Sequence, residues 1–272
     1  MEHGSPPMLV RTTIANGVAE IVMDAPPVNA VGPPLLDALT GALERAAEDP
    51  EVGAVVLASV RPDLFSAGLD LALVRDGDAD AALAVVRRLY LGIGDLQDRL
   101  GKPTVAAVGG VARGAGITLA VQCDVVVADS KASFAYAEID VGLLPGIHLV
   151  HLPRLAGRHV AFDLLFSGRP FGADEAHGLG IAARIAPAGL ARETALDLAR
   201  TLAAKPRAAM RLGRSAFRRI ADRPTDRVNV ERTIDALGDL LASAETRETI
   251  AAVLTSRAEA RKDPGREAQP TP

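Results

Sequence analysis

Short apolar runs alternate with segments of helical periodicity over most of the chain, and this alternation constrains the fold more than any other feature. Three continuous runs are predicted as strands buried on both faces, at residues 53–60, 104–108 and 125–128. Segments with apolar residues at helical spacing accompany them, at residues 35–46, 79–100 and 114–122. Because strands and helices alternate, the sequence predicts an α/β fold whose strands pair in parallel.

Other signals mark the two ends of this α/β core. Asn16-Gly17 lies between two short β-like runs, 10–15 and 18–23, and predicts a β-hairpin. Strand signals stop after Arg192, where the sequence predicts helices near residues 191–204, 206–221 and 226–260. We therefore predict four regions: a flexible tail at 1–9, a core at 10–195, a helical region at 196–261 and a flexible tail at 262–272.

Composition argues against several classes of protein. A chain of 272 residues can bury a core without disulfides, and Cys123 has no second cysteine to pair with. The net charge of −4, and an aromatic content of 3% without tryptophan, argue against a nucleic-acid partner. The most apolar segment, 104–121, contains Arg113 and four glycines, so we expect no membrane span. The N-terminus lacks the pattern of a signal peptide, which predicts a cytoplasmic protein.

Two small-residue turns stand where a ligand could approach the main chain. Arg113-Gly114-Ala115-Gly116 joins a predicted strand to a helix, but Leu119 occupies the third glycine position of a dinucleotide fingerprint. The N–H groups at such a helix start suit an oxyanion or a phosphate; otherwise these glycines only permit close packing. The segment 65–70 is either a similar ligand-contacting turn around a glycine or an ordinary strand-to-helix connection.

Candidate titratable residues follow in the middle of the chain. Glu138 has apolar neighbours, so it is paired, caps a helix, or is a site residue with a raised pKa, and Asp140 is a weaker candidate by the same argument. His148 and His151 could share a helix face, but two ligands without a nearby carboxylate are weak evidence for a metal, and none is predicted.

A basic stripe lies in the C-terminal region. On a helix, one face would carry Arg207, Arg211, Arg214 and Arg218. A different face would carry Ala209, Leu212, Ala216 and Ile220, and we expect that apolar face to pack inward. The arginines then form either a solvated cationic surface or a seat for phosphates.

In order along the chain, these segments resemble the crotonase superfamily, also called the enoyl-CoA hydratase/isomerase family. The resemblance spans roughly residues 10–190 and rests on Val28-Asn29-Ala30, residues 65–71, 102–110 and 114–120, Cys123-Asp124, residues 132–134, Glu138, and residues 142–146 and 170–180. It implies a spiral of ββα turns followed by helices that build homotrimers or hexamers. It also implies an acyl-CoA thioester as substrate, with no further cofactor.

The resemblance also implies roles for individual residues. The oxyanion hole would be formed by the main-chain N–H groups of Leu69 and Ala115. The surrounding substrate contacts would come from Val28, Ala30, Ala67, Gly68, Asp70, Leu71 and Gly114. Arg214 matches the family's usual lysine on a C-terminal helix, and Arg214 or an adjacent member of the stripe would contact the CoA phosphates across a trimer interface.

The sequence resemblance indicates the family more specifically than it indicates the reaction. Hydratases of this family use two glutamates, and here the first falls at Thr118 while the second is Glu138. This pattern resembles the Δ3-Δ2-enoyl-CoA isomerases, in which Glu138 would move one proton from C2 to C4. A hydratase that uses Asp140 or His148, and a non-catalytic acyl-CoA-binding protein, are the alternatives. RNA binding through the arginine stripe is disfavoured by the negative net charge.

Overall fold

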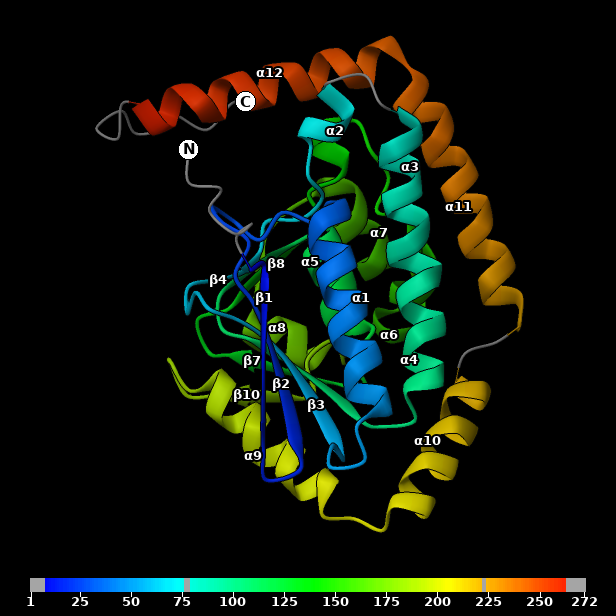
Figure 1. Cartoon of the computed structure of the whole chain (residues 1–272). Coiled ribbons are helices and arrows are strands. Elements are labelled where there is room, and N and C mark those ends of the chain that lie inside the picture. Colours follow the sequence, from blue (N-terminus) through cyan, green and yellow to red (C-terminus); the bar gives the residue numbers. More distant parts are fainter. Residues whose placement is uncertain (1–7, 76–78, 222–223, 263–272) are drawn as a thin grey trace, which may run out of the picture.

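The computed structural model describes residues 8–75, 79–221 and 224–262. Its larger sheet has the strand order β1-β2-β3-β5-β7-β10 (Figure 1). These strands are β1 Val10–Ala15, β2 Val18–Met23, β3 Ala54–Ser59, β5 Thr104–Val108, β7 Val125–Asp129 and β10 Arg184–Ala186. The pair β1–β2 is the predicted antiparallel hairpin, and every later neighbour in this sheet pairs in parallel, as expected.

A smaller sheet lies beyond the carboxyl ends of these strands. Its order is β4-β6-β8-β9, with bounds Leu64–Ser66, Val111–Arg113, Ser133–Ala135 and Phe171–Gly172. The first three strands pair in parallel, and β9 pairs antiparallel with β8. The chain therefore passes repeatedly from the larger sheet to the smaller one and then into a helix, which is the expected spiral of ββα turns.

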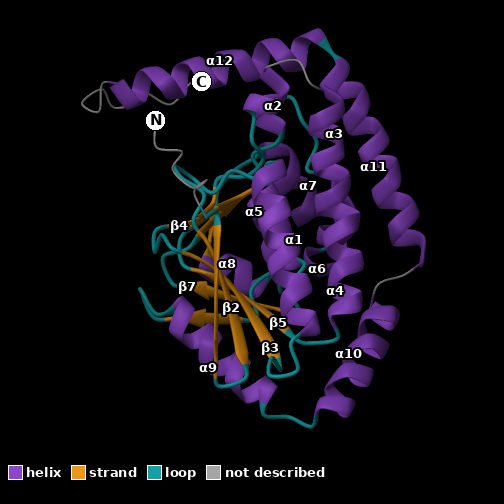
Figure 2. Ribbon diagram, in the orientation of Figure 1, coloured by secondary structure: helices purple, strands orange, loops and turns teal. Residues whose placement is uncertain are grey.

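Helices surround the two sheets and extend beyond them at the C-terminus (Figure 2). Those of the core are α1 Pro33–Glu48, α2 Ala72–Arg75, α3 Ala79–Arg87, α4 Ile93–Leu100, α5 Ala115–Val121, α6 Gly146–Ala156, α7 Arg158–Ser167, α8 Ala173–Gly178 and α9 Ala191–Ala203. The last three are α10 Arg207–Ala221, α11 Pro224–Ala242 and α12 Ala244–Lys262. A π-helical turn, Arg88–Gly92, joins α3 to α4, and a 3-10 turn, Ile139–Val141, precedes α6.

Alternation along the strands of the larger sheet supplies two apolar faces. In β3, Val55 and Leu57 face the main core, whereas Ala54, Val56 and Ala58 face α9. Helix α9 covers that second face with its buried alanines Ala191, Ala195 and Ala199. The boundary predicted between residues 195 and 196 falls inside this helix, which packs on the sheet along its length. The separate helical region begins after α9.

Helix α10 is turned opposite to the expectation. Its arginine stripe faces the protein, where Arg214 is buried, Arg207 donates to main-chain carbonyls of residues 50–52 and Arg218 pairs with Asp98 and Asp124. Its apolar stripe faces outward, with Leu212 60% and Ile220 81% exposed. The apolar face that was expected to pack inward is thus left uncovered in the single chain.

Two further expectations concern the chain termini and membrane spans. Of the predicted tails, 1–9 and 262–272, only Met8, Leu9 and Lys262 lie within the described residues. No helix in the described part of the chain is long and apolar enough to cross a membrane.

Candidate active site

A cavity of about 160 Å³ opens where β4, the start of α5 and the 3-10 turn meet. Most of the residues predicted for a substrate site surround it: Ala67, Gly68, Leu69, Leu71, Gly114, Ala115 and Glu138. Apolar side chains complete its walls, including Val86, Leu89, Leu143 and Leu144. The cavity therefore combines one carboxyl group, two small-residue turns and an apolar lining.

The turn after β4 is held by an earlier loop. Buried Asn29, at φ +48°, donates from Nδ2 to the Phe65 carbonyl at 3.0 Å and to Ser59 Oγ at 2.9 Å. Ser66 Oγ donates to the Asn29 carbonyl at 2.7 Å, so this hydroxyl is already engaged. These bonds fix the approach of the chain to Leu69.

A parallel bridge between Val31 and Leu69 sets the direction of the Leu69 main chain. Val31 donates its N–H to the Gly68 carbonyl at 2.8 Å and accepts from the Asp70 N–H at 3.0 Å. In a parallel bridge the residues on either side of Leu69 make these bonds, so its own N–H points away from Val31. That donor remains available to a ligand.

The start of α5 lies directly against this turn. A Cβ atom at Gly68, which has φ +99°, would lie 3.0 Å from the Arg113 carbonyl oxygen and 3.7 Å from the Ala115 nitrogen. A Cβ atom at Gly116 would lie 2.8 Å from Ser66. Glycine at both positions lets the two segments touch, which brings the N–H of Ala115, in the first turn of a helix, beside that of Leu69.

Glu138 supplies the carboxyl group of the cavity. The residue is half-buried, its Oε2 atom is buried, and no described residue hydrogen-bonds to that atom. Burial raises the pKa of Glu138 to about 7, and the nearby charge of Asp140 adds to the rise. A carboxyl group with this pKa exchanges a proton readily at neutral pH.

The other proposed acid–base residues lie elsewhere. Thr118 is fully buried, and its hydroxyl lies 3.0 Å from Nε2 of His148. Burial lowers the pKa of His148 to about 3, with a further contribution from His151, so the ring is neutral. Asp140 is exposed and lies against Gly168, outside the cavity. Glu138 is therefore the only Asp, Glu or His among the described residues that line the cavity.

Three predicted contact residues support the site from behind its walls. The Val28 carbonyl accepts the Ala67 N–H at 3.0 Å, and Ala30 precedes the bridging residue Val31. Asp70 accepts the Ala72 N–H on Oδ1 at 3.1 Å and so begins α2. None of the side chains of Val28, Ala30 and Asp70 lines the cavity in the described structure.

Arg214 does not have the position expected of a phosphate ligand. Its guanidinium is buried and donates to Asp124 Oδ2 at 2.7 Å, to the Gln97 carbonyl at 2.5 Å and to Gln97 Oε1 at 3.1 Å. Asp124 also accepts the Thr104 N–H, so the pair ties α10 to α4 and the larger sheet. Its expected role in holding CoA phosphates across an interface is therefore corrected to a structural one.

Several residues at the cavity were not predicted as substrate contacts, among them Arg113, Tyr90, Leu237 and Arg257. Tyr90 comes from the π-helical turn, Leu237 from α11 and Arg257 from α12, which crosses above α2 in Figure 1. Helical periodicity identified these helices, but it contains no signal for where a C-terminal helix folds back. Arg257 places a positive charge beside the cavity. The sequence had assigned the corresponding charge, the one that contacts the CoA phosphates, to Arg214.

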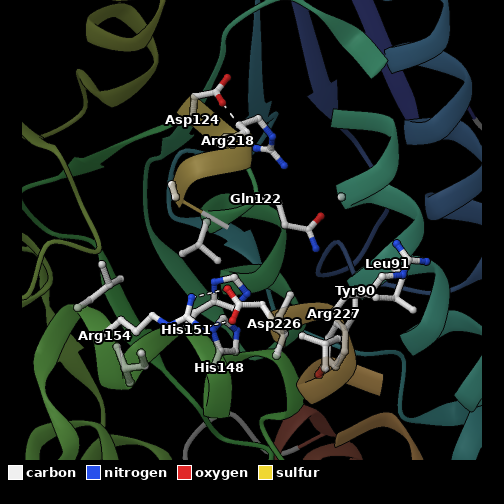
Figure 3. A pocket seen from close by; sticks show the side chains of 18 of the residues that line it. Tyr90, Leu91, Gln122, Asp124, His148, His151, Arg154, Arg218, Asp226 and Arg227 are labelled. Atoms are coloured by element: carbon white, nitrogen blue, oxygen red, sulfur yellow. Dashed lines mark hydrogen bonds and ion pairs between the residues drawn. The ribbon is translucent and has the colours of Figure 1, made fainter. Parts of the chain in front are cut away.

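A second cavity, of about 610 Å³, lies between α4, α6, α10 and α11 (Figure 3). Its lining is mainly apolar, and the carboxylates in its walls pair with arginines of the same walls: Arg154–Asp226, Arg227–Asp95, and Arg218 with both Asp98 and Asp124. The larger space therefore does not present an unpaired carboxylate to a ligand.

A carboxyl group of raised pKa beside two unengaged main-chain N–H groups is suited to proton transfer next to a carbonyl, with the N–H groups holding the developing oxyanion. Together with the ββα spiral, this arrangement is typical of an enzyme that moves a proton next to a carbonyl group. The sequence model described as Enoyl-CoA hydratase/isomerase matches residues 13–263. The chain belongs to that family, within the crotonase superfamily, and is an enzyme of acyl-CoA processing.

Individual relatives agree with this assignment. A Thermus thermophilus protein, named provisionally as an enoyl-CoA hydratase, is 39% identical over 187 residues, covering 68% of this chain and 73% of the relative. A Rattus norvegicus mitochondrial protein, enoyl-CoA hydratase domain-containing protein 3, is 30% identical over 214 residues, covering 78% and 71%. The solved enoyl-CoA hydratase/isomerase of Pseudoalteromonas atlantica is 27% identical at a TM-score of 0.80, covering 91% and 97%.

Proposed function

We propose that the enzyme isomerises 3-enoyl-CoA thioesters to 2-enoyl-CoA thioesters. The observation that carries this proposal is that Glu138 is the one described residue that offers a carboxyl group to the cavity shared with Leu69 and Ala115. Isomerisation needs one group that takes a proton from C2 and returns it at C4. Addition of water needs an acid and a base that act on the same water molecule.

Each step can be assigned to groups on the cavity wall. Glu138, as a carboxylate, removes a proton from C2 while the thioester oxygen becomes an oxyanion that accepts from the Leu69 and Ala115 N–H groups. The protonated Glu138 then returns the proton at C4, and the double bond moves from C3–C4 to C2–C3. Substrate and product are isomers, so no other reactant is needed. The positive charge of Arg257 suits the CoA phosphates.

Hydration of 2-enoyl-CoA is the second candidate, because both curated relatives described above carry hydratase names. The structure gives it less support. The threonine at the first glutamate position is buried against His148, and the two suggested replacements, Asp140 and His148, do not line the cavity. A bound water would therefore meet only one carboxyl group, and no histidine, among the described residues that line the cavity.

The assignment is tested by supplying 3-hexenoyl-CoA and 2-hexenoyl-CoA separately and identifying the products by mass spectrometry and chromatography. We expect 3-hexenoyl-CoA to become 2-hexenoyl-CoA, with far slower formation of 3-hydroxyhexanoyl-CoA from either. Glu138→Gln keeps the shape of the side chain and should lower isomerisation by a factor of about 10²–10⁴.

Two results would contradict the proposal. Faster hydration than isomerisation by the wild-type enzyme would favour the hydratase. Tight acyl-CoA binding with no turnover of either thioester would indicate a protein that binds acyl-CoA without acting on it. Asp197→Asn, the same change on the exposed face of α9, should leave isomerisation within about twofold of wild type.

A further inference from the structure

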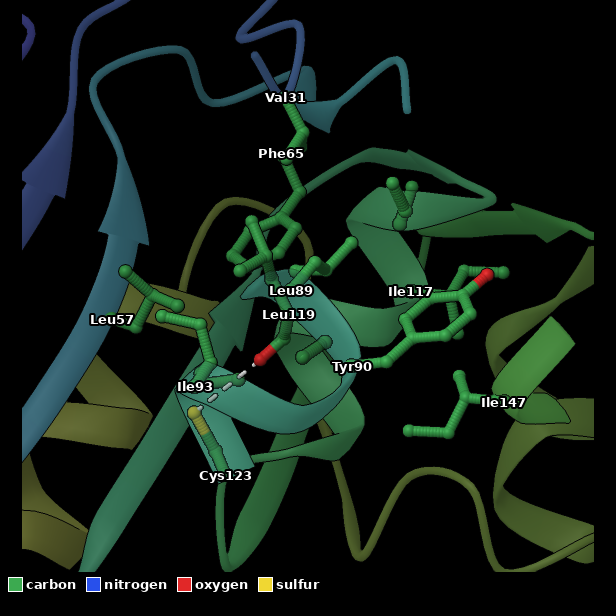
Figure 4. Close-up of a cluster of buried hydrophobic side chains, with 14 of the residues drawn as sticks. Val31, Leu57, Phe65, Leu89, Tyr90, Ile93, Ile117, Leu119, Cys123 and Ile147 are labelled. Carbon is green, nitrogen blue, oxygen red and sulfur yellow. Dashed lines mark hydrogen bonds between the residues drawn. The ribbon is translucent and has the colours of Figure 1, made fainter. Parts of the chain in front are cut away.

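The side chain of Tyr90 separates the two cavities. Among the residues that the structure describes, it is the only one that lines both the cavity of Glu138 and the larger cavity beside α10 and α11. Figure 4 shows its ring on the side of the turn that faces Ile147, and Figure 3 shows it at the edge of the larger cavity. The ring is therefore a shared wall.

Close packing holds this wall in place. Tyr90 is 7% exposed, and a Cβ atom at Gly146 would lie 2.6 Å from its ring. Only glycine leaves room at position 146, so the start of α6 presses directly on the aromatic ring. A buried ring in such contact does not move aside without displacing its neighbours.

The main chain that carries Tyr90 is also fixed. In the π-helical turn, the Ile93 N–H donates to the carbonyl of Arg88, five residues earlier. Gln122 Nε2 donates to the Leu89 carbonyl at 2.7 Å, which gives a partner to a carbonyl in the widened turn. Gln122 is thus a positioning residue for Tyr90, attached through the residue immediately before it.

The volumes on the two sides of the ring differ in what they can hold. The cavity of Glu138, about 160 Å³, is smaller than the usual small-molecule site of roughly 300–1,000 Å³. It therefore has room for a short acyl group but not for a long acyl chain. The cavity behind Tyr90, about 610 Å³, is within the usual range of small-molecule sites, roughly 300–1,000 Å³.

We propose that Tyr90 determines acyl-chain length in this enzyme: its ring ends the acyl pocket and confines the substrates to short acyl groups. The larger cavity is the space that a longer chain would enter if the ring were absent. Val121, Ile147 and Leu152 give that space apolar walls, and its carboxylates are already paired. The inference rests on the proposed function only in taking an acyl-CoA thioester as the ligand.

The test compares butanoyl-CoA with decanoyl-CoA by isothermal titration calorimetry. Neither has the C3–C4 double bond of the proposed substrate, so the affinities are measured without isomerisation. In the wild-type enzyme we expect decanoyl-CoA to bind no tighter than butanoyl-CoA. Tyr90→Ala should bind decanoyl-CoA at least tenfold tighter than butanoyl-CoA, because each newly buried methylene strengthens binding about fourfold. Tyr90→Phe keeps the ring and should behave as wild type.

A wild-type enzyme that binds decanoyl-CoA more than tenfold tighter than butanoyl-CoA would overturn the proposal without any variant. An unchanged affinity ratio in folded Tyr90→Ala would also overturn it. If that variant does not fold, Tyr90→Leu replaces it. Failure of the isomerase assay with 3-hexenoyl-CoA would remove the proposed reaction, yet it would leave these affinities and the role of Tyr90 intact.

Discussion

The Glu138 carboxylate rests on the main chain of Gly114: a Cβ atom at position 114 would lie 2.8 Å from Oε1 and 2.9 Å from Cδ of Glu138. Gly114 has φ +44°, in the region that favours glycine, and its position immediately precedes Ala115. One glycine thus makes room for the proposed base and sets the direction of one proposed oxyanion donor.

Gly114→Ala should therefore impair catalysis more than stability. The added methyl group displaces Glu138 and turns the Ala115 N–H, so we expect kcat for isomerisation to fall by about a hundredfold or more. The unfavourable φ should cost about 1–2 kcal/mol of folding free energy. Gly178→Ala, in α8 where a Cβ meets nothing within 4 Å, is the matched control and should leave kcat unchanged. Equal activity in the two variants would refute this role of Gly114.

The pKa of Glu138 predicts how activity depends on pH. Since burial raises this pKa to about 7, the carboxylate that acts as base is depleted below that value. We expect kcat/KM for 3-hexenoyl-CoA to fall about tenfold for each pH unit below 7 and to level off above it. The measurement is a pH–rate profile in buffers of constant ionic strength. A flat profile between pH 5 and 8 would exclude Glu138 as the base.

The same shift predicts how stability depends on pH. The folded state prefers neutral Glu138, because its pKa is raised from 4.5 to about 7. The contribution of this group is fully favourable below pH 4.5 and is lost as the pH rises through 7. Glu138→Gln is neutral throughout, so its Tm should exceed that of wild type at pH 8 by more than at pH 5. Thermal scans at both pH values measure the difference, and an equal difference at both would contradict the shift.

The buried guanidinium of Arg214 predicts a loss of stability. Arg214→Ala removes one of the two arginines that pair with Asp124 and leaves the Gln97 carbonyl without this donor, which should cost about 1–3 kcal/mol of folding free energy. CoA affinity in the folded fraction should not change. Arg257→Ala should do the reverse: it should weaken CoA binding, most at low salt, while leaving the Tm close to wild type. A stable Arg214→Ala variant with weakened CoA binding would restore the role expected from the sequence.

The outward apolar face of α10 predicts self-association. Leu212 and Ile220 on this face are 60% and 81% exposed, and exposed apolar patches mark contact surfaces. We expect the protein to be oligomeric, and Leu212→Glu with Ile220→Glu to shift it toward monomer in analytical ultracentrifugation. Leu190→Glu, the same change on a different exposed leucine, should not. A wild-type protein that is monomeric at micromolar concentration would refute the expectation.

The elements that were predicted correctly are those with strong local patterns. Strands β3, β5 and β7 are buried on both faces, so their apolar runs are continuous and easily recognised. Strands of two or three residues, such as β9 at Phe171–Gly172, carry no periodicity, and the smaller sheet was therefore not predicted from residue patterns alone. The orientation of α10 was predicted wrongly for another reason. Asp124 lies on the surface that α10 covers and pairs with Arg214, so the arginine face of the helix turns inward.

Residue patterns alone indicated the two small-residue turns of the candidate site and its carboxyl group. Small residues at Gly68 and Gly114 reveal where a ligand can approach the backbone, and an acid among apolar neighbours reveals Glu138. Tyr90 was predicted only as one member of an apolar helical stripe, because its role depends on which two cavities meet at its ring. Arg257 depends on the path of α12, which local sequence does not determine.

The bridge between Val31 and Leu69 has a consequence for reading natural variation in this enzyme. The donor at position 69 is a peptide group, so any residue except proline can stand there without removing it. Two homologues could differ at position 69 and work equally well, while a homologue identical there could be inactive after a change at Asn29, which anchors the neighbouring turn. Changes in the loop around Asn29 should therefore reduce activity more often than changes of the side chain at position 69.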